Sequence, residues 1–249
     1  MPMLFRFTFL TLLLVVAASC NSGSDGPQSA SDSPAPASLE EQLKSILLKD
    51  EEVPEGLEGA DLAYSTNEQL AGPSEEELQR LNALGRQLGV DITYVPVSDI
   101  PADSPARGGI QNSASVYLGN SGSVAAFKVR SEAARTNDWP ANYTDLTDVK
   151  TTEMDRQIAD ETYWLRVTGL DKCDESTATP GVSPTPTCPP ARLAVIDHIL
   201  IRSGRTFVYL MVASDVAASS PDDVFAVDIE GWATAVASRA SQTFPPAGR

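Results

Sequence analysis

The sequence predicts an α+β domain, in which an antiparallel sheet of about five to six strands carries helices packed on it. Segments with alternating apolar residues occur beside segments whose apolar residues recur at helical spacing. Ser203 and Gly204 leave room only for a hairpin turn between the last two expected strands, so these strands pair antiparallel. A helix with one apolar stripe follows this hairpin and needs a sheet to cover.

Two helices open the expected domain. Ser38 followed by Glu41 has the spacing of a capping box, and leucine and isoleucine residues recur behind it until Pro54 prevents further helix. Ser74 starts a second helix with the same signature, and a leucine stripe runs from there to Gly89.

The middle of the chain combines strands and one helix. Strands are expected at residues 90–97 and 114–118, and residues 119–122 have the glycine, asparagine and serine of a turn. A helix should follow at 123–135, whereas residues 136–157 are too polar to assign.

The last part of the domain gives the strongest signals. Residues 161–168, 192–202 and 206–212 are rich in β-branched and aromatic residues and predict three strands. We expect Ser220 to cap the final helix, with Pro221 at its first position. The core-facing stripe of this helix consists of Phe225, Ile229, Trp232 and Val236.

Residues 1–19 are predicted to be a signal peptide. The apolar run at 7–18 is too short for the ~20 residues that span a bilayer, and it matches the apolar region of a secretory signal. Small residues then lead into Cys20, which resembles the bacterial lipobox, although Ala17 stands where that pattern usually has leucine. The alternative is an ordinary cleaved signal with an incidental cysteine.

Lipidation of Cys20 predicts an anchor on the extracytoplasmic face of the cell membrane, or on the outer membrane if the cell has one. Stable attachment needs more than one acyl chain, which a diacylglyceryl group supplies. Residues 20–38 contain no leucine, isoleucine, valine or aromatic residue and predict a flexible linker. Residues 39–243 are expected to form a single domain.

The charge and the cysteines fit a protein outside the cytoplasm. A net charge of −16 repels nucleic acid, so nucleic-acid binding is excluded. Cys173 and Cys188 bracket an insertion rich in proline, threonine and serine (173–188), and a disulfide between them would contribute about 3 kcal/mol. A redox or metal pair is the weaker alternative, because the spacing is not Cys-x-x-Cys and no histidine lies nearby.

No motif in the sequence predicts catalysis, a cofactor or a metal site. The one histidine, His198, follows Asp197, and neighbours in a strand point to opposite faces, so the two cannot form a catalytic pair. We expect His198 to be a packed, hydrogen-bonded residue. Tyr163 and Trp164 either line a ligand groove or belong to the core.

A cluster of acidic residues leaves two readings open. It is either a Ca²⁺ site or a solvated loop, and the second is favoured because the EF-hand spacing is absent. The cluster consists of Asp145, Asp148, Glu153, Asp155, Asp160 and Glu161.

Short motifs in a fixed order resemble a group of uncharacterised bacterial envelope lipoproteins found in lineages such as Chloroflexi. The motifs are Pro54-Glu55-Gly56, Leu84-Gly85-Arg86, Val116-Tyr117-Leu118 with Ala125-Ala126-Phe127, Ile158-Ala159-Asp160-Glu161-Thr162 and Ile201-Arg202-Ser203-Gly204. The group usually has glycine where this chain has Ala159. The layout is also similar to the PsbP/Mog1 type of α+β fold. The resemblance implies a membrane-anchored protein but assigns no catalytic residue.

The sequence is compatible with three functions. The expected one is a non-catalytic module that binds a small ligand or an envelope protein and meets the membrane through its lipid anchor. A hydrolase with paired carboxylates would need two acids about 5–9.5 Å apart in a cleft. A purely structural surface protein would show a flat exposed patch instead.

Overall fold

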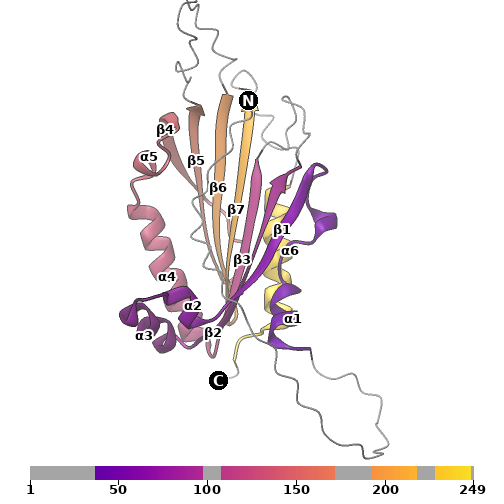
Figure 1. The fold of residues 1–249 in the computed structure, drawn as a ribbon, viewed down its shortest axis with the longest axis vertical. Coiled ribbons are helices and arrows are strands. Elements are labelled where there is room, and N and C mark those ends of the chain that lie inside the picture. Colours follow the sequence, from indigo (N-terminus) through magenta and orange to yellow (C-terminus); the bar gives the residue numbers. More distant parts are fainter. Residues whose placement is uncertain (1–36, 98–107, 172–191, 218–227, 248–249) are drawn as a thin grey trace, which may run out of the picture. The chain divides into compact units, whose positions relative to one another are not determined.

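The computed structural model describes residues 37–97, 108–171, 192–217 and 228–247 (Figure 1). These residues all fall within one compact unit, Ala37–Arg249. The predicted signal peptide, Cys20, most of the linker and the insertion with Cys173 and Cys188 lie outside the described residues. No helix among the described residues has the length and apolar character needed to cross a membrane.

One antiparallel sheet forms the centre of the fold and confirms the predicted α+β class. Its seven strands have the spatial order β1-β2-β3-β7-β6-β5-β4, and every neighbouring pair runs antiparallel. The count exceeds the predicted five to six strands. The strands are β1 (Leu57–Ser65), β2 (Arg86–Pro96), β3 (Gly109–Tyr117), β4 (Leu146–Met154), β5 (Glu161–Asp171), β6 (Arg192–Ser203) and β7 (Thr206–Ala217).

Helices cover both faces of this sheet (Figure 1). Helices α1 and α6 pack on one face, called here the α6 face, and α4 and α5 lie on the other, the α4 face. The α4 face also carries α2 and α3 near the first two strands. The helices are α1 (Leu39–Lys44), the short 3₁₀ helix η1 (Asp50–Glu52), α2 (Asn67–Ala71), α3 (Glu75–Ala83), α4 (Asn120–Thr136), α5 (Trp139–Asn142) and α6 (Ile229–Thr243).

Alternation along the strands divides the core into two apolar clusters. The cluster on the α6 face includes Trp164, Ile199 and Val236. The cluster on the α4 face includes Phe127 and Tyr163. Trp164 and Tyr163 therefore face opposite sides, as the period of two in a strand requires.

Several predicted helix boundaries are wrong. Helix α6 begins at Ile229 with Asp228 as its N-cap, and the Gly231 N–H donates to Asp228 Oδ1 at 2.8 Å. The predicted cap Ser220, together with Pro221 and Phe225, lies outside the described residues. The Asp228 carboxylate thus accepts a hydrogen bond from one of the backbone N–H groups that the first turn leaves unpaired.

The two helices predicted at the start of the domain, α1 and α3, end earlier than their leucine stripes indicate. Helix α1 stops at Lys44, and the buried residues that follow it pack without helical structure. Helix α3 stops at Ala83, because Gly85 has φ of 67° and turns the chain into β2. The capping predictions at both starts are confirmed, since Ser38 and Ser74 accept hydrogen bonds from Glu41 N and Glu77 N.

Candidate functional site

A groove opens on the α6 face where β4 and β5 meet the start of α6. We call it the α6 groove, and its volume is about 290 Å³. Its lining is largely polar and brings charges of both signs together. The lining residues are Met154, Arg156, Trp164, Arg166, Asp228, Ile229 and Glu230.

A buried charge network backs this groove. Asp197 on β6 is buried, and it accepts hydrogen bonds from Arg166 Nε at 2.9 Å and Arg166 Nη2 at 3.0 Å. The indole N–H of Trp164 donates to the same carboxylate at 2.6 Å. Strong charge-assisted bonds of this kind fix both side chains in one orientation.

Strand pairing explains why these three side chains meet. In the register of β5 and β6, Arg166 lies directly opposite Asp197, and Trp164 lies opposite Ile199. Trp164 and Arg166 point to the same face because they are two residues apart in β5, and Asp197 shares that face because it is the cross-strand partner of Arg166. Met154 of β4 pairs with Trp164 and brings its side chain to the same place.

Helix α6 supplies the opposite wall of the groove. Asp228 is the N-cap and holds the Gly231 N–H, so its carboxylate is fixed at the helix start. Glu230 accepts a hydrogen bond from Arg156 Nε at 3.1 Å, and both side chains are about half exposed. An exposed ion pair of this type contributes at most about 1 kcal/mol and opens readily.

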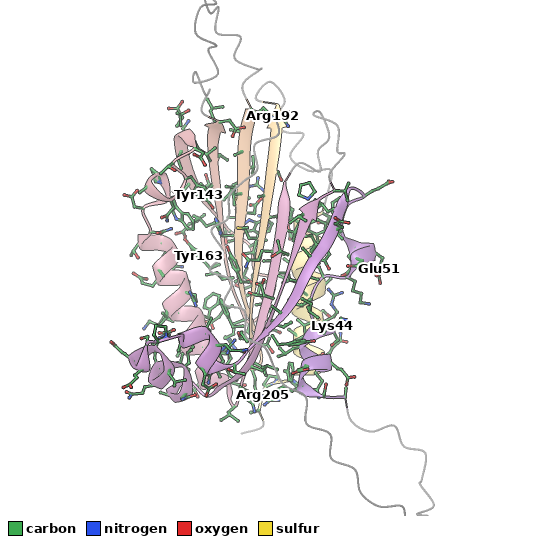
Figure 2. The ribbon with its side chains drawn as sticks, viewed as in Figure 1. Lys44, Glu51, Tyr143, Tyr163, Arg192 and Arg205 are labelled. Carbon is green, nitrogen blue, oxygen red and sulfur yellow. The ribbon has the colours of Figure 1, made fainter. Side chains whose placement is uncertain are left out.

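His198 lies on the α4 face, away from the groove, and the prediction of a packed, hydrogen-bonded histidine is confirmed. Its Nε2 lies 2.9 Å from the Tyr143 hydroxyl, and its Nδ1 lies 2.7 Å from the Tyr209 hydroxyl. The Trp139 ring stands over the imidazole with 4.5 Å between ring centroids. Figure 2 shows Tyr143 on the same side of the sheet as α4 and α5.

Burial governs the protonation of this histidine cluster. Desolvation lowers the pKa of His198 to about 4 and raises the pKa of Tyr143 to about 12. The imidazole is therefore neutral at neutral pH and bonded at both nitrogens. Asp197 points to the other face and binds Arg166, which confirms that the two neighbours do not pair.

The predicted acidic cluster is dispersed by the structure. Glu153 on β4 accepts from the Tyr163 hydroxyl at 3.1 Å, while Asp160 and Glu161 both bind Arg202. The Gly204 N–H also donates to Asp160, so this acid serves the hairpin turn. Within the ranges that the structure describes, no group of three or more acids, histidines and cysteines could hold a metal ion.

Sequence reasoning missed the arginines of the groove. Arg166 lay in the strand predicted at 161–168 but was given no role, and Arg156 fell in the unassigned stretch. A signal was available at Asp197, since a carboxylate inside an apolar strand requires a cationic partner. The partner itself depends on the register between strands, which the sequence does not display.

Comparisons with known proteins give little further information. No family model matches the chain, and no curated protein matches it. The resemblance to Chloroflexi envelope lipoproteins and to the PsbP/Mog1 fold therefore stays a prediction. Among solved structures, the chain is similar to the extracellular domain of PknH from Mycobacterium tuberculosis, with 9% sequence identity and a TM-score of 0.41. The match covers 82% of this chain and 96% of that domain.

Proposed function

We propose that this protein is a membrane-anchored, extracytoplasmic lipoprotein whose domain binds a small polar ligand in the α6 groove. The observation that carries the binding proposal is the groove itself, a hollow of about 290 Å³ whose charged lining is held by a buried network. Small-molecule sites are concave and use a few well-placed polar groups to orient the ligand. The volume suits a molecule smaller than a typical drug.

The lining favours a zwitterionic ligand such as an amino acid or a short peptide. Opening the weak Arg156–Glu230 pair leaves a guanidinium for the ligand's carboxylate and a carboxylate for its ammonium group. Met154 and Ile229 supply apolar surface for a side chain. Arg166 adds a second cation whose position is fixed by Asp197.

The same contacts argue against the hydrolase alternative. A hydrolase of this kind needs two free carboxylates, whereas one of the two groove carboxylates, Asp228, is held as the N-cap of α6. A general acid or base must be free to exchange a proton with the substrate. The concave, charged lining also favours ligand binding over a purely structural role.

Titration calorimetry of the purified full chain tests the binding proposal. A panel of amino acids and dipeptides should contain at least one ligand that binds saturably. Arg156→Gln should weaken that binding at least tenfold, because it removes the guanidinium that meets the carboxylate. Arg135→Gln is the matched control, since Arg135 is also an exposed arginine in an ion pair, with Glu153, on the other face. Absence of binding across the panel, or equal weakening by both variants, would contradict the proposal.

The membrane half of the proposal rests on the sequence. The apolar run at 7–18, Cys20 and the polar linker support export, lipidation and a tether that holds the domain above the headgroups. The resemblance to envelope lipoproteins supports the same location.

A further inference from the structure

Arg86 is a buried cation on the α4 face whose hydrogen-bond partners are all neutral. The residue is 6% exposed. Its Nη1 donates to the Ser65 carbonyl and to Asn67 Oδ1, both at 3.0 Å. Its Nη2 donates to Ser65 Oγ at 2.8 Å, and its Nε donates to Ser115 Oγ at 3.2 Å.

A β-bulge directs Arg86 to this position. The register of β2 and β3 shifts between Arg86 and Leu88, so Arg86 pairs with Tyr117 and shares the face of Ser115. Gly89 then provides the space, because a Cβ at Gly89 would lie 2.0 Å from Arg86 Nη2. The bulge and the glycine together leave room for the guanidinium between Ser65 and Ser115.

No carboxylate compensates this charge among the residues that the structure describes. A buried ion without a counter-ion is costly, and proteins normally pair it. Here burial lowers the pKa of Arg86, and the neighbouring Tyr117 phenol, rather than a carboxylate, opposes that shift. The chain as a whole carries a net charge of −16, so a positive centre of this kind is a local exception.

A second cation and a free hydroxyl lie beside Arg86. Arg130 on α4 is exposed, and within the described ranges it has no ion-pair partner. It lies close enough to Arg86 to lower the pKa of that guanidinium. Tyr117 is 4% exposed, its hydroxyl forms no hydrogen bond within the described part of the chain, and Arg86, Arg130 and Arg80 all act on its pKa.

The acid in this neighbourhood is already occupied. Glu77 lies within electrostatic reach of Arg130, but both of its oxygens bind Arg80, at 2.7 Å and 2.6 Å. The bidentate pair leaves Arg86 and Arg130 without a carboxylate of their own. Two uncompensated guanidinium groups and one hydroxyl donor are the groups that bind a carboxylate or phosphate.

We propose that Arg86, Arg130 and the Tyr117 hydroxyl form a binding site for the carboxylate or phosphate group of a small soluble molecule. The site is independent of the α6 groove, because it lies on the opposite face of the sheet and shares no residue with it. Arg86 supplies a fixed charge, Tyr117 is its partner across the strands, and Arg130 comes from α4.

Titration of the purified full chain with inorganic phosphate and with succinate, at constant ionic strength in a neutral detergent, tests this site. Saturable binding of at least one of the two anions is expected. Arg130→Ala should weaken it at least tenfold, and Tyr117→Phe about threefold, with thermal stability close to that of the wild type. Neither variant removes a hydrogen bond made within the described residues, so loss of binding would not reflect unfolding.

Arg135→Ala is the control for general electrostatics. It removes one positive charge from the same helix, where Arg135 meets Glu153 and Tyr163 instead. Anion binding should be unchanged in this variant. The proposal is overturned if neither anion binds saturably, if Arg130→Ala and Arg135→Ala weaken binding equally, or if binding occurs only to vesicles containing phosphatidylglycerol. Failure of the groove ligands would leave this result unaffected, because the two sets of variants do not overlap.

Discussion

At the scale of single residues, the charge of Asp197 inside the sheet is the strongest constraint on the fold near the groove. Its side chain is 1% exposed and satisfies Trp164 and Arg166 together. Asp197→Ala should reduce the free energy of unfolding by about 3 kcal/mol, because it leaves a guanidinium and an indole N–H without their acceptor. Urea denaturation followed by circular dichroism measures this loss.

The comparison residue for Asp197 is Glu153. Its side chain is 58% exposed and lies 3.6 Å from Arg135, so Glu153→Ala should cost less than about 1 kcal/mol. Similar losses in the two variants would show that the buried network does not stabilise the fold as described.

The buried His198 makes stability depend on pH. Its pKa is about 4 in the folded protein and about 6.5 when unfolded, so the unfolded chain binds more protons between these values. Stability is therefore present above pH 6.5 and is lost as the pH falls towards 4. Between pH 7 and pH 5 the loss from this residue should be about 2 kcal/mol.

Comparison with His198→Gln isolates this effect from the titration of the acids. Urea denaturation of both proteins at pH 7 and pH 5 should show a smaller pH-dependent loss in the variant. An equal loss in the two proteins would mean that His198 is hydrated or charged in the folded state.

At the scale of elements, the contact between α3 and α4 depends on a single glycine. A Cβ at Gly122 would lie 2.0 Å from the Leu84 carbonyl oxygen, whereas a Cβ at Gly119 meets nothing within 4 Å. Gly122→Ser should therefore cost about 1–3 kcal/mol through overpacking. Gly119→Ser should be neutral or slightly stabilising, because serine is a good N-cap and Gly119 is the N-cap of α4.

Thermal unfolding of both glycine variants checks this prediction. The melting temperature should fall only in Gly122→Ser. An equal fall in melting temperature in both variants would contradict the close contact between Gly122 and the Leu84 carbonyl.

The elements also show what the sequence could predict. Strands β5, β6 and β7 each have a neighbouring strand on both sides and are largely buried, so their β-branched and aromatic residues gave clear signals. Strands β1 and β4 are the edges of the sheet, and only Leu146 is buried in β4. An edge strand buries few side chains, so its composition resembles that of a loop. For this reason β1 and β4 were not predicted from the sequence.

Functional residues were harder to predict than strands because they depend on contacts between elements. Alternation separated Asp197 from His198 correctly, since that argument needs only one strand. Arg166 required the β5–β6 register, and Arg86 required a bulge that turns its side chain to the other face. Neither feature leaves a mark in the local sequence.

At the scale of the whole molecule, the sheet separates two charged sites on opposite faces. The α6 groove combines cations and carboxylates. The proposed site of Arg86, Arg130 and Tyr117 is positive, although the chain has a net charge of −16. A concentrated positive site in an acidic protein attracts small anions more selectively than an overall basic surface does. We expect the two sites to bind different ligands.

The place of the domain outside a membrane is the claim on which this picture depends most. Mass spectrometry of the amino terminus of the native protein, extracted from membranes, tests it directly. We expect the mature chain to begin at Cys20 and to carry the added mass of a diacylglyceryl group on that sulfur. A mature chain that begins at another residue, or an unmodified Cys20, would contradict it.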